Sequence, residues 1–349
     1  MSKLKIAVFF GGCSSEYGVS LQSAHAVISH MDPAKYDPVL IGITKYGDWY
    51  EYTGDLDSIV NDNWYNQFDC LPAVISPSRR LQGLIVFTPN GPRTERLDAA
   101  MPILHGKNGE DGTLQGLLEL AGIPIVGCNT LSSALCMDKD RAHKLVQLAG
   151  IRVPQAFVLK KGQELATSVA AAESYGYPLF VKPVKAGSSY GVTKVMNMEE
   201  LLPAIDMAFQ YDDEVIIEEN IPGFEVGCAV LGCDDPQVGE LDEIELAEGF
   251  FDFEEKYNLI TSNIHVPARI DPAKAAELKE AAKVIYKALG CSIFARVDMF
   301  LTPNGEIVFN EVNTIPGFTA HSRYATMFKA IGISFDQIID TAIAMAVKK

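Results

Sequence analysis

The feature that most constrains the fold is a regular alternation of short apolar runs with helix-like segments through the first third of the 349-residue chain. Strands are expected over residues 5–10, 39–44, 83–88 and 99–105, and helices over residues 19–31 and 113–121. Such alternation predicts a parallel sheet with helices on both faces. Residues 51–82 are polar and rich in turn-forming residues, so an irregular excursion is expected there.

The remaining two thirds of the chain continue with mixed strand and helix signals. Strands are expected over residues 156–159, 179–182, 191–196, 214–219, 226–231 and 240–248, and helices over residues 138–148, 164–175, 199–209 and 273–289. The last helix has the clearest pattern, because Asp271 can cap it, Pro272 takes the favoured first position and Gly290 ends it. Residues 249–264 fit neither pattern, and long loops inside compact domains are often active-site lids.

Composition excludes several classes of function. The chain has 29 basic and 45 acidic residues and a net charge of −16, which argues against nucleic acid and anionic membranes as partners. No apolar run approaches the ~20 residues that a bilayer span needs, and the N-terminal run is interpreted as a strand and not as a signal peptide, so a cytoplasmic location is expected. The seven cysteines are scattered without a CxxC pair, which predicts reduced, mostly buried thiols and no zinc site.

A hairpin is predicted near the C-terminal end. The strand-like runs 292–301 and 307–312 flank the turn TPNGE, and Asn304-Gly305 is the strongest short hairpin signal, typical of a two-residue type I′ turn. Pairing Pro303 with Glu306 then sets the register of the two strands. That register gives two facing pairs on one face of the hairpin: Asp298 with Glu311, and Arg296 with Asn313.

Two facing carboxylates repel each other unless a cation lies between them. Carboxylate and amide oxygens suit Mg²⁺ or Mn²⁺, and Mg²⁺ is usually completed by substrate phosphates, so the hairpin face suggests a nucleotide site. The alternative is a solvated strand face on which Arg296 neutralises Asp298.

A second group of residues suggests a phosphate site. Lys182 ends a strand, and the loop that follows it, GSSYG at residues 187–191, has glycines that permit close approach and serines that can donate hydrogen bonds. The same loop could be a flexible turn, and the P-loop pattern GxxxxGK[ST] is absent. Lys139 and Lys256 could add positive charge, although a lone lysine is usually a solvated surface residue.

Polar residues also follow the predicted strands of the first third. Glu16 comes shortly after Gly11 and Gly12, at the edge of the sheet where parallel folds bind ligands. The stretch is not GxGxxG, so a dinucleotide is excluded. Glu16 either stabilises a helix N-terminus or anchors a substrate ammonium group. His105 opens another polar glycine loop and is an ambiguous titrating group.

Eight segments of the chain form an ordered set of motifs: FFGGCSSEYGVSLQSA, LHGKNGEDGTLQGLLE, MDK, FVKPVKAGSSYGV, EENIPGFE, FFDFEEKY, ARVDMF and EVNTIPGFTAHS. Together they closely resemble the D-alanine–D-alanine ligase family of ATP-grasp enzymes. The resemblance implies an α/β fold of three-domain ATP-grasp architecture with an N-terminal Rossmann-like parallel sheet. It implies an N-terminal domain over residues 1–126, a central ATP-grasp subdomain over 127–213, and a C-terminal subdomain over 214–349 with a mobile loop near 247–264.

The resemblance also implies the chemistry. In this family ATP phosphorylates the carboxylate of a first D-alanine, and the amine of a second substrate then attacks the acyl phosphate. Bound cations offset the repulsion between the anions, and a closed lid excludes water. The residues that would contact ATP are Lys139, Lys182, Ser189, Glu218, Glu219, Ile221, Glu225 and Lys256. The residues that would hold two Mg²⁺ ions, or Mn²⁺, are Asp298, Glu311 and Asn313.

The resemblance assigns further residues to the amino-acid substrates. Glu16 would hold the first ammonium group, positioned through Ser188 and Tyr257. Arg296 and the backbone N–H of Gly317 would stabilise the tetrahedral oxyanion. Ser322 would bind the carboxylate of the second substrate. His105 and Phe251 would also line the substrate pocket. The family usually forms homodimers, so a homodimer is expected.

One departure from the family pattern suggests a subtype. Arg323 follows Ser322, where D-alanine–D-alanine ligases typically carry Leu or Met. An apolar side chain there would pack on a methyl group, whereas a guanidinium can donate hydrogen bonds to a hydroxyl. The arginine resembles the D-alanine–D-serine ligases of vancomycin resistance, of the VanC and VanG type. The alternative for Arg323 is an outward salt bridge.

The expected activity is therefore ATP-dependent formation of D-alanyl-D-serine for peptidoglycan precursors that bind vancomycin less well. An ordinary D-alanine–D-alanine ligase of cell-wall synthesis is the alternative. A carboxylate–amine ligase for another amino acid and a non-catalytic nucleotide sensor are further possibilities of a different class.

Overall fold

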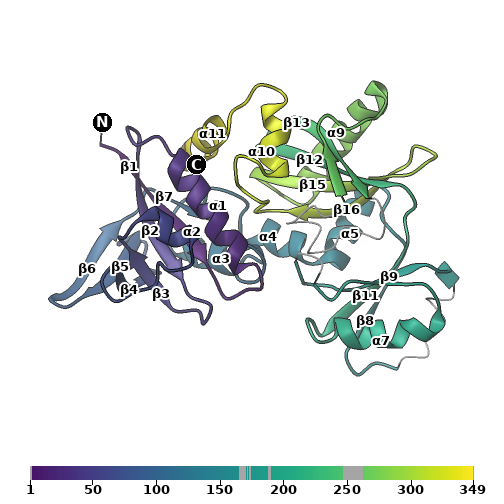
Figure 1. Cartoon of the computed structure of the whole chain (residues 1–349), viewed down its shortest axis with the longest axis horizontal. Coiled ribbons are helices and arrows are strands. Elements are labelled where there is room, and N and C mark those ends of the chain that lie inside the picture. Colours follow the sequence, from purple (N-terminus) through teal and green to yellow (C-terminus); the bar gives the residue numbers. More distant parts are fainter. Residues whose placement is uncertain are drawn as a thin grey trace.

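Three sheets make up the molecule (Figure 1). The computed structural model describes residues 2–164, 170, 172, 174–187, 190–246 and 262–348. The first sheet has the strand order β6-β5-β4-β3-β2-β1-β7. Its strands are β1 (Leu4–Gly11), β2 (Tyr36–Ile43), β3 (Trp49–Tyr52), β4 (Cys70–Ile75), β5 (Gly83–Thr88), β6 (Gly91–Arg96) and β7 (Ala99–Pro102).

Helices cover both faces of the first sheet, as expected. Alternate residues of β1 point to opposite sides: Ile6, Val8 and Phe10 pack with α1 (Tyr17–His30) and α11 (Phe335–Lys348), whereas Ala7 and Phe9 pack with α3 (Thr113–Ala121). The parallel pairing that alternation predicts is confined to β2, β1 and β7. The other pairs, from β2–β3 to β5–β6, are antiparallel.

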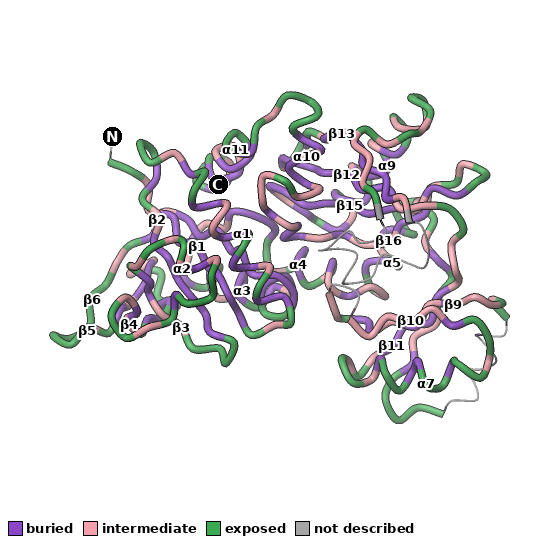
Figure 2. The backbone as a smooth tube through the Cα atoms, in the orientation of Figure 1, coloured by how far each residue is buried: buried purple, intermediate pink, exposed green. Residues whose placement is uncertain are grey.

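The expectation of an irregular excursion over residues 51–82 is wrong. That stretch contributes the end of β3, the helix α2 (Leu56–Val60) and the strand β4. In β4 the buried residues are Cys70, Ala73 and Ile75, and this short apolar strand stands inside a stretch that is polar on average. The strand β6, most of which is exposed, lies at the outer edge (Figure 2).

The second sheet is antiparallel, with the order β10-β9-β11-β8, and is covered by α7 (Met198–Ala208). Its strands are β8 (Ala156–Lys160), β9 (Leu179–Pro183), β10 (Thr193–Val195) and β11 (Glu214–Glu219). The expected domain boundary between residues 213 and 214 therefore cuts β11 from its own sheet. The helices α4 (Thr130–Met137) and α5 (Lys139–Leu148), expected in the central subdomain, pack into the core of the third sheet.

The third sheet is antiparallel, with the order β14-β13-β12-β15-β16. Its strands are β12 (Phe224–Gly232), β13 (Gln237–Leu246), β14 (Ser262–His265), β15 (Ile293–Leu301) and β16 (Ile307–Asn313). The helix α9 (Pro272–Ala288) covers one face, and α10 (Arg323–Lys329) and α11 cover the other.

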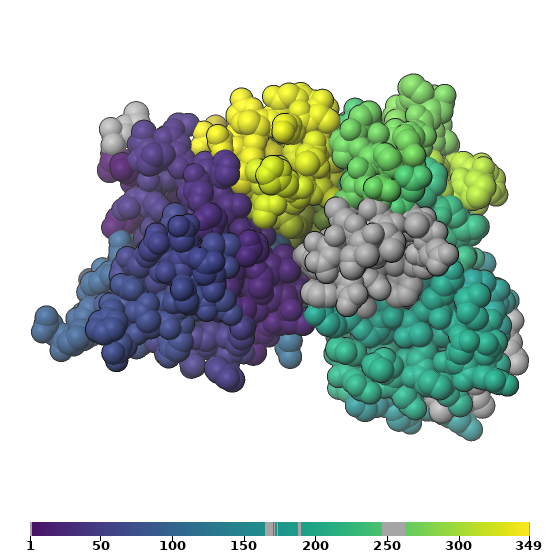
Figure 3. Space-filling model, viewed as in Figure 1, coloured from purple at the N-terminus to yellow at the C-terminus, as the bar shows by residue number. Residues whose placement is uncertain are grey.

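The first and third sheets share one apolar core. Side chains of β1, α1, α11 and β15 belong to the same buried cluster. The C-terminal residues accordingly lie between the N-terminal part and the third sheet (Figure 3). Within the described residues, no helix has the length and apolar character that crossing a bilayer requires. Five of the seven cysteines are buried and none forms a disulfide, as expected.

Candidate functional site

Three glycine loops from different parts of the chain converge on the carboxylate of Glu16. Glu16 lies between the end of β1 and the start of α1 and is 5% exposed. A Cβ atom at Gly106 would lie 2.2 Å from Oε2 of Glu16, and one at Gly187 would lie 2.8 Å from the same atom. Only glycine leaves room for the carboxylate at these two positions, so the loops after β1, β7 and β9 meet at one point.

A cavity of about 40 Å³ adjoins this point and gathers most of the predicted motifs. The residues that line it are Glu16, Glu110, Cys136, Met137, Lys139, Ala186, Gly187, Glu311, Val312, Asn313 and Thr314. Nζ of Lys139 donates to the carbonyl of Ala186 at 2.7 Å. Burial, and after it the nearby charge of Glu16, raises the pKa of Glu110 to about 8.

The predicted register of the β15–β16 hairpin is confirmed at the site, although the turn is different. Arg296 faces Asn313 and Asp298 faces Glu311, as expected. Near the turn, however, Leu301 pairs with Ile307, which is one residue out of the predicted register. The loop spans three residues, with Gly305 at φ +80°, and its N–H donates to the carbonyl of Thr302. A bulge between Asp298 and Met299 then restores the register.

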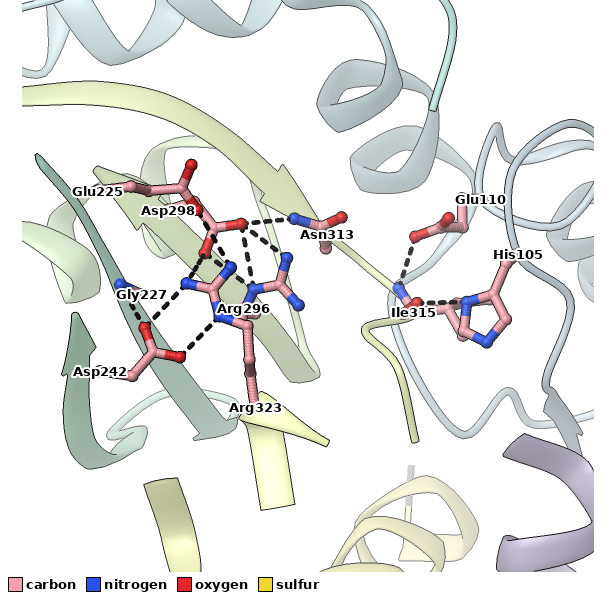
Figure 4. Close-up of polar contacts among 10 residues, drawn as sticks. All are labelled: His105, Glu110, Glu225, Gly227, Asp242, Arg296, Asp298, Asn313, Ile315 and Arg323. Carbon is pink, nitrogen blue, oxygen red and sulfur yellow. Dashed lines mark hydrogen bonds and ion pairs between the residues drawn. The ribbon is translucent and has the colours of Figure 1, made fainter. Parts of the chain in front are cut away.

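Asp298 is held by buried cations (Figure 4). Nε of Arg296 donates to Oδ1 of Asp298 at 2.8 Å, and its second terminal nitrogen donates to Oδ2, also at 2.8 Å. Nδ2 of Asn313 donates to Oδ2 at 2.9 Å. The ion pair between Arg296 and Asp298 is thus formed, but it is buried and is not the solvated strand face considered from the sequence.

The oxygen ligands that the structure describes around Asp298 are of the kind that magnesium prefers, but they are too few to enclose the ion. Glu311 and Asn313 bring hard oxygen ligands to the cavity, next to Asp298. Among the described residues, no group of three or more His, Cys, Asp or Glu is arranged to hold a metal ion. Such a donor set does not form a closed protein cage, and it fits an ion that is completed by phosphate oxygens and water.

Of the residues expected to contact ATP, Glu218 on β11 points toward α5, and its Oε1 lies 3.8 Å from Nδ1 of His143. Nζ of Lys182 donates to Oε2 of Glu218 at 2.7 Å. Burial is the largest effect and alone would raise the pKa of Glu218, but the positive charge and hydrogen bond of Lys182, with the charges nearby, together outweigh it, and the pKa lies below its ordinary value. Glu219 accepts from the backbone N–H of Gln155 at 2.9 Å, and Ile221 is half-buried.

Arg323 points inward into a cluster of carboxylates, as Figure 4 shows. Its Nε donates to Oδ2 of Asp242 at 2.6 Å, and one terminal nitrogen donates to Oδ1 at 2.8 Å. Its other terminal nitrogen donates to Glu225 at 3.1 Å, and Oδ1 of Asp298 lies 3.5 Å from the terminal nitrogen that binds Asp242. Asp242 is fully buried, and Arg323 holds the pKa of its carboxyl below the ordinary value against the opposing effect of burial. The alternative of an outward salt bridge is wrong, because the partners are buried.

The side chains of His105 and Glu110 both form hydrogen bonds with the backbone of Ile315. Nδ1 of His105 donates to the carbonyl of Ile315 at 2.9 Å, and Oε1 of Glu110 accepts from its N–H at 3.0 Å. Both contacts are drawn in Figure 4. Burial lowers the pKa of His105 to about 4. The two side chains therefore connect the first sheet to the segment that leads to Gly317.

The segment after β16 brings the remaining predicted residues near this place. Gly317 lies next to the Cβ of Ser322, whose hydroxyl donates to the carbonyl of Thr319 at 2.8 Å. The predicted residues Ser188, Ser189, Phe251, Lys256 and Tyr257, with most of the expected loop, lie outside the described residues.

Sequence reasoning missed Asp242 and assigned no role to Glu110. Asp242 belongs to the acidic run GELDEIEL, which resembles a solvated strand edge, and no pattern in the sequence indicated that this one carboxyl is fully buried. Glu110 was part of a polar glycine loop, and its contact with Ile315 bridges 205 residues.

Comparisons with known proteins agree with this architecture. A family model described as the D-ala D-ala ligase N-terminus matches residues 5–128, and one described as the D-ala D-ala ligase C-terminus matches residues 145–344. Vancomycin B-type resistance protein VanB of Enterococcus faecalis is 46% identical over 354 residues, which cover 100% of both chains. Two solved structures are also similar over most of the chain.

The VanG D-Ala:D-Ser ligase from Enterococcus faecalis is 57% identical, with a TM-score of 0.92 over 99% of this chain and 100% of that one. The D-alanine–D-alanine ligase from Bacillus anthracis, solved in complex with ATP, is 30% identical, with a TM-score of 0.73 over 99% of this chain and 97% of that one.

Proposed function

The chain belongs to the D-alanine–D-alanine ligase family, and from that premise we propose that it joins D-alanine to D-serine with ATP. The main support for D-serine as the second substrate is the buried position of Arg323. Its guanidinium is buried beside Arg296 and Asp298 and is fixed by Asp242. A buried donor in that position favours a second substrate that offers a hydroxyl. The likeness to the VanG D-Ala:D-Ser ligase supports the same proposal.

The proposed reaction has two steps. The carboxylate of D-alanine attacks the γ-phosphorus of ATP, so that an acyl phosphate forms and ADP leaves. The amine of D-serine then attacks the acyl carbon, and the peptide bond forms as phosphate leaves and the amine gives up a proton. The first step brings two anions together, and Lys139 and Lys182 would reduce their repulsion.

Seven further residues have proposed tasks in these steps. Glu16, enclosed by Gly106 and Gly187, would bind the ammonium group of D-alanine. Arg296 and the N–H of Gly317 would stabilise the oxyanion. Asp298, Glu311 and Asn313 would hold Mg²⁺, which when bound neutralises charge on the nucleotide phosphates. Ser322 would bind the carboxylate of D-serine. The active form is proposed to be a cytoplasmic homodimer.

The first experiment separates the classes of function. Phosphate release from ATP and Mg²⁺ is measured without amino acid, with D-alanine alone and with D-alanine plus D-serine. A ligase of the proposed subtype releases phosphate fastest with both amino acids. A nucleotide sensor releases none, and a ligase for another amino acid does not respond to D-alanine.

A variant tests Arg323 as the residue that selects the second substrate. Arg323→Leu should lower the ratio of kcat/KM for D-serine to that for D-alanine about tenfold. An unchanged ratio would favour the ordinary D-alanine–D-alanine ligase, an activity that the Bacillus anthracis relative carries.

A further inference from the structure

We propose that His143 selects the base of the nucleotide: its Nδ1 and Oε1 of Glu218 form a pair of acceptors for the exocyclic amine of adenine. The inference rests on the proposed function, in which ATP is a substrate and Glu218 is one of the residues that the family resemblance assigns to it. It adds a residue, His143, to which no role has been assigned so far. It also names the chemical group of the substrate that the residue would recognise.

The position of His143 makes the contact with the base possible. His143 lies on α5, which runs between β16 of the third sheet and β9 and β11 of the second sheet (Figure 1). Its Nε2 lies 3.2 Å from the carbonyl oxygen of Asn310 on β16, and its ring packs edge-on against Phe309 at 5.5 Å between centroids. Its Nδ1 faces Glu218 on β11. The ring therefore bridges the second and third sheets.

The hydrogen bond to Asn310 fixes the tautomer of His143. A carbonyl oxygen can only accept, so the proton must be on Nε2, and Nδ1 carries a lone pair. Burial lowers the pKa of His143, and Lys182 and Lys139 lower it further against the effect of Glu218, so the ring is neutral near pH 7. Nδ1 is thus an acceptor.

Two buried acceptors then face each other without a donor. Nδ1 of His143 and Oε1 of Glu218 are 3.8 Å apart, and neither has a hydrogen-bond partner in the described part of the chain. The two side chains are only 7% and 3% exposed. Leaving such groups unpaired is costly, whereas one –NH₂ group can lie about 2.9 Å from both atoms and give each a hydrogen. Oε2 of Glu218 is already bonded to Lys182.

This arrangement distinguishes purines by the substituent at C6. Adenine carries an amine there, which donates two hydrogens. Hypoxanthine and guanine carry a carbonyl oxygen, which would add a third acceptor beside these two. A buried water could satisfy the same pair, since His143 also lines a cavity of about 290 Å³. The experiment must therefore separate recognition of the base from a structural water.

The probes are ATP and ITP, which differ at C6 and in the proton on N1. Binding of each is measured calorimetrically with Mg²⁺ for the wild type, for His143→Leu and for the control Gln147→Leu. Gln147 lies one turn further along α5 and is exposed. We expect the wild type to bind ATP at least tenfold more tightly than ITP. His143→Leu should weaken ATP about tenfold and ITP little, and Gln147→Leu should change neither.

If His143→Leu does not fold, a second variant, His143→Lys, tests the same inference. In His143→Lys the ammonium group can pair with Glu218 and donate to a carbonyl at C6, so the preference for ATP over ITP should fall at least tenfold. In steady-state assays both His143 variants should raise the KM for ATP and leave kcat within twofold, a split that a general loss of structure would not give.

The outcomes distinguish this inference from the proposed function. An ATP-to-ITP ratio unchanged in both His143 variants means that the pair holds a water only, and this overturns the inference. If ligase activity persists in that case, the proposed function stands. If the wild type binds neither nucleotide, both fail.

Discussion

At the scale of single residues, the pair of Arg323 and Asp242 should dominate stability. Arg323→Leu leaves a fully buried carboxyl uncompensated, and we expect the free energy of unfolding to fall by about 3–5 kcal/mol. The double variant Arg323→Leu with Asp242→Asn removes the charge and keeps an oxygen for the N–H of Gly227, so it should be more stable than the single variant. Urea unfolding of the set measures both, and a single variant as stable as the wild type would contradict the buried pair.

His105 should make the protein sensitive to mild acid. Its pKa is about 4 in the folded chain and about 6.5 when unfolded. Between these values the unfolded chain binds a proton that the folded chain does not, so stability falls as the pH drops through this window and is unaffected by this group above it. From pH 6.5 to pH 5 the loss should be on the order of 2 kcal/mol. His105→Gln should lose that much less over the same range in urea titrations, and equal losses would refute the assignment.

The positions of site residues could be predicted from the sequence where the residues lie close together in the chain. The opposition of Asp298 and Glu311 followed from the Asn-Gly turn, although two errors cancelled, because the loop is one residue longer and a bulge compensates. Contacts across the fold were not predictable. The link from Arg323 to Asp242 spans 81 residues, and no local pattern indicates it.

At the scale of elements, α9 offers a clean test because its cap is local. The side chain of Asp271 accepts from the N–H of Ala273 at 2.9 Å and from that of Lys274 at 3.4 Å. Asp271→Ala should lower the free energy of unfolding by about 1 kcal/mol, and Asp271→Asn, which keeps the acceptor, should lower it less. Ligase activity should be unchanged in both. Equal losses in the two variants would show that the cap is not the cause.

The elements themselves were predicted best where they are long or strongly patterned. The expected bounds of α9 and β11 differ from the observed bounds by at most one residue. The short strands β3, β4 and β6 were missed: β3 has only four residues, β4 is apolar but contains Pro72, and β6 is exposed almost throughout. Their pairing partners, which decide that they are strands, lie elsewhere in the chain.

At the scale of the whole molecule, the contacts of Glu110 and His105 with Ile315 join the first sheet to the third. Glu110→Gln replaces one accepting oxygen by a donor that would face an N–H group, so one of its two backbone contacts is lost. We expect kcat to fall about tenfold with the KM for ATP within twofold, because the segment leading to Gly317 loses its support. Asp111→Asn, at the next residue, is the control in the same assay. Wild-type kcat in Glu110→Gln would rule out this role.

The α/β class could be predicted from alternation, and the three sheets from the resemblance, but how the sheets share a core could not. The buried cluster common to β1, α1, α11 and β15 depends on packing between the two ends of the chain. Likewise, the expected domain boundary at residue 213 separates β11 from β8 and β9, with which it pairs although β10 and α7 intervene in the chain.

The central claim is that this ligase takes D-serine as its second substrate, and product identification tests it most directly. The enzyme is supplied with ATP, Mg²⁺ and equal concentrations of D-alanine and D-serine near neutral pH, and the dipeptides are separated by mass. The account predicts that D-alanyl-D-serine is the main product. A predominance of D-alanyl-D-alanine at every pH around neutrality would contradict it.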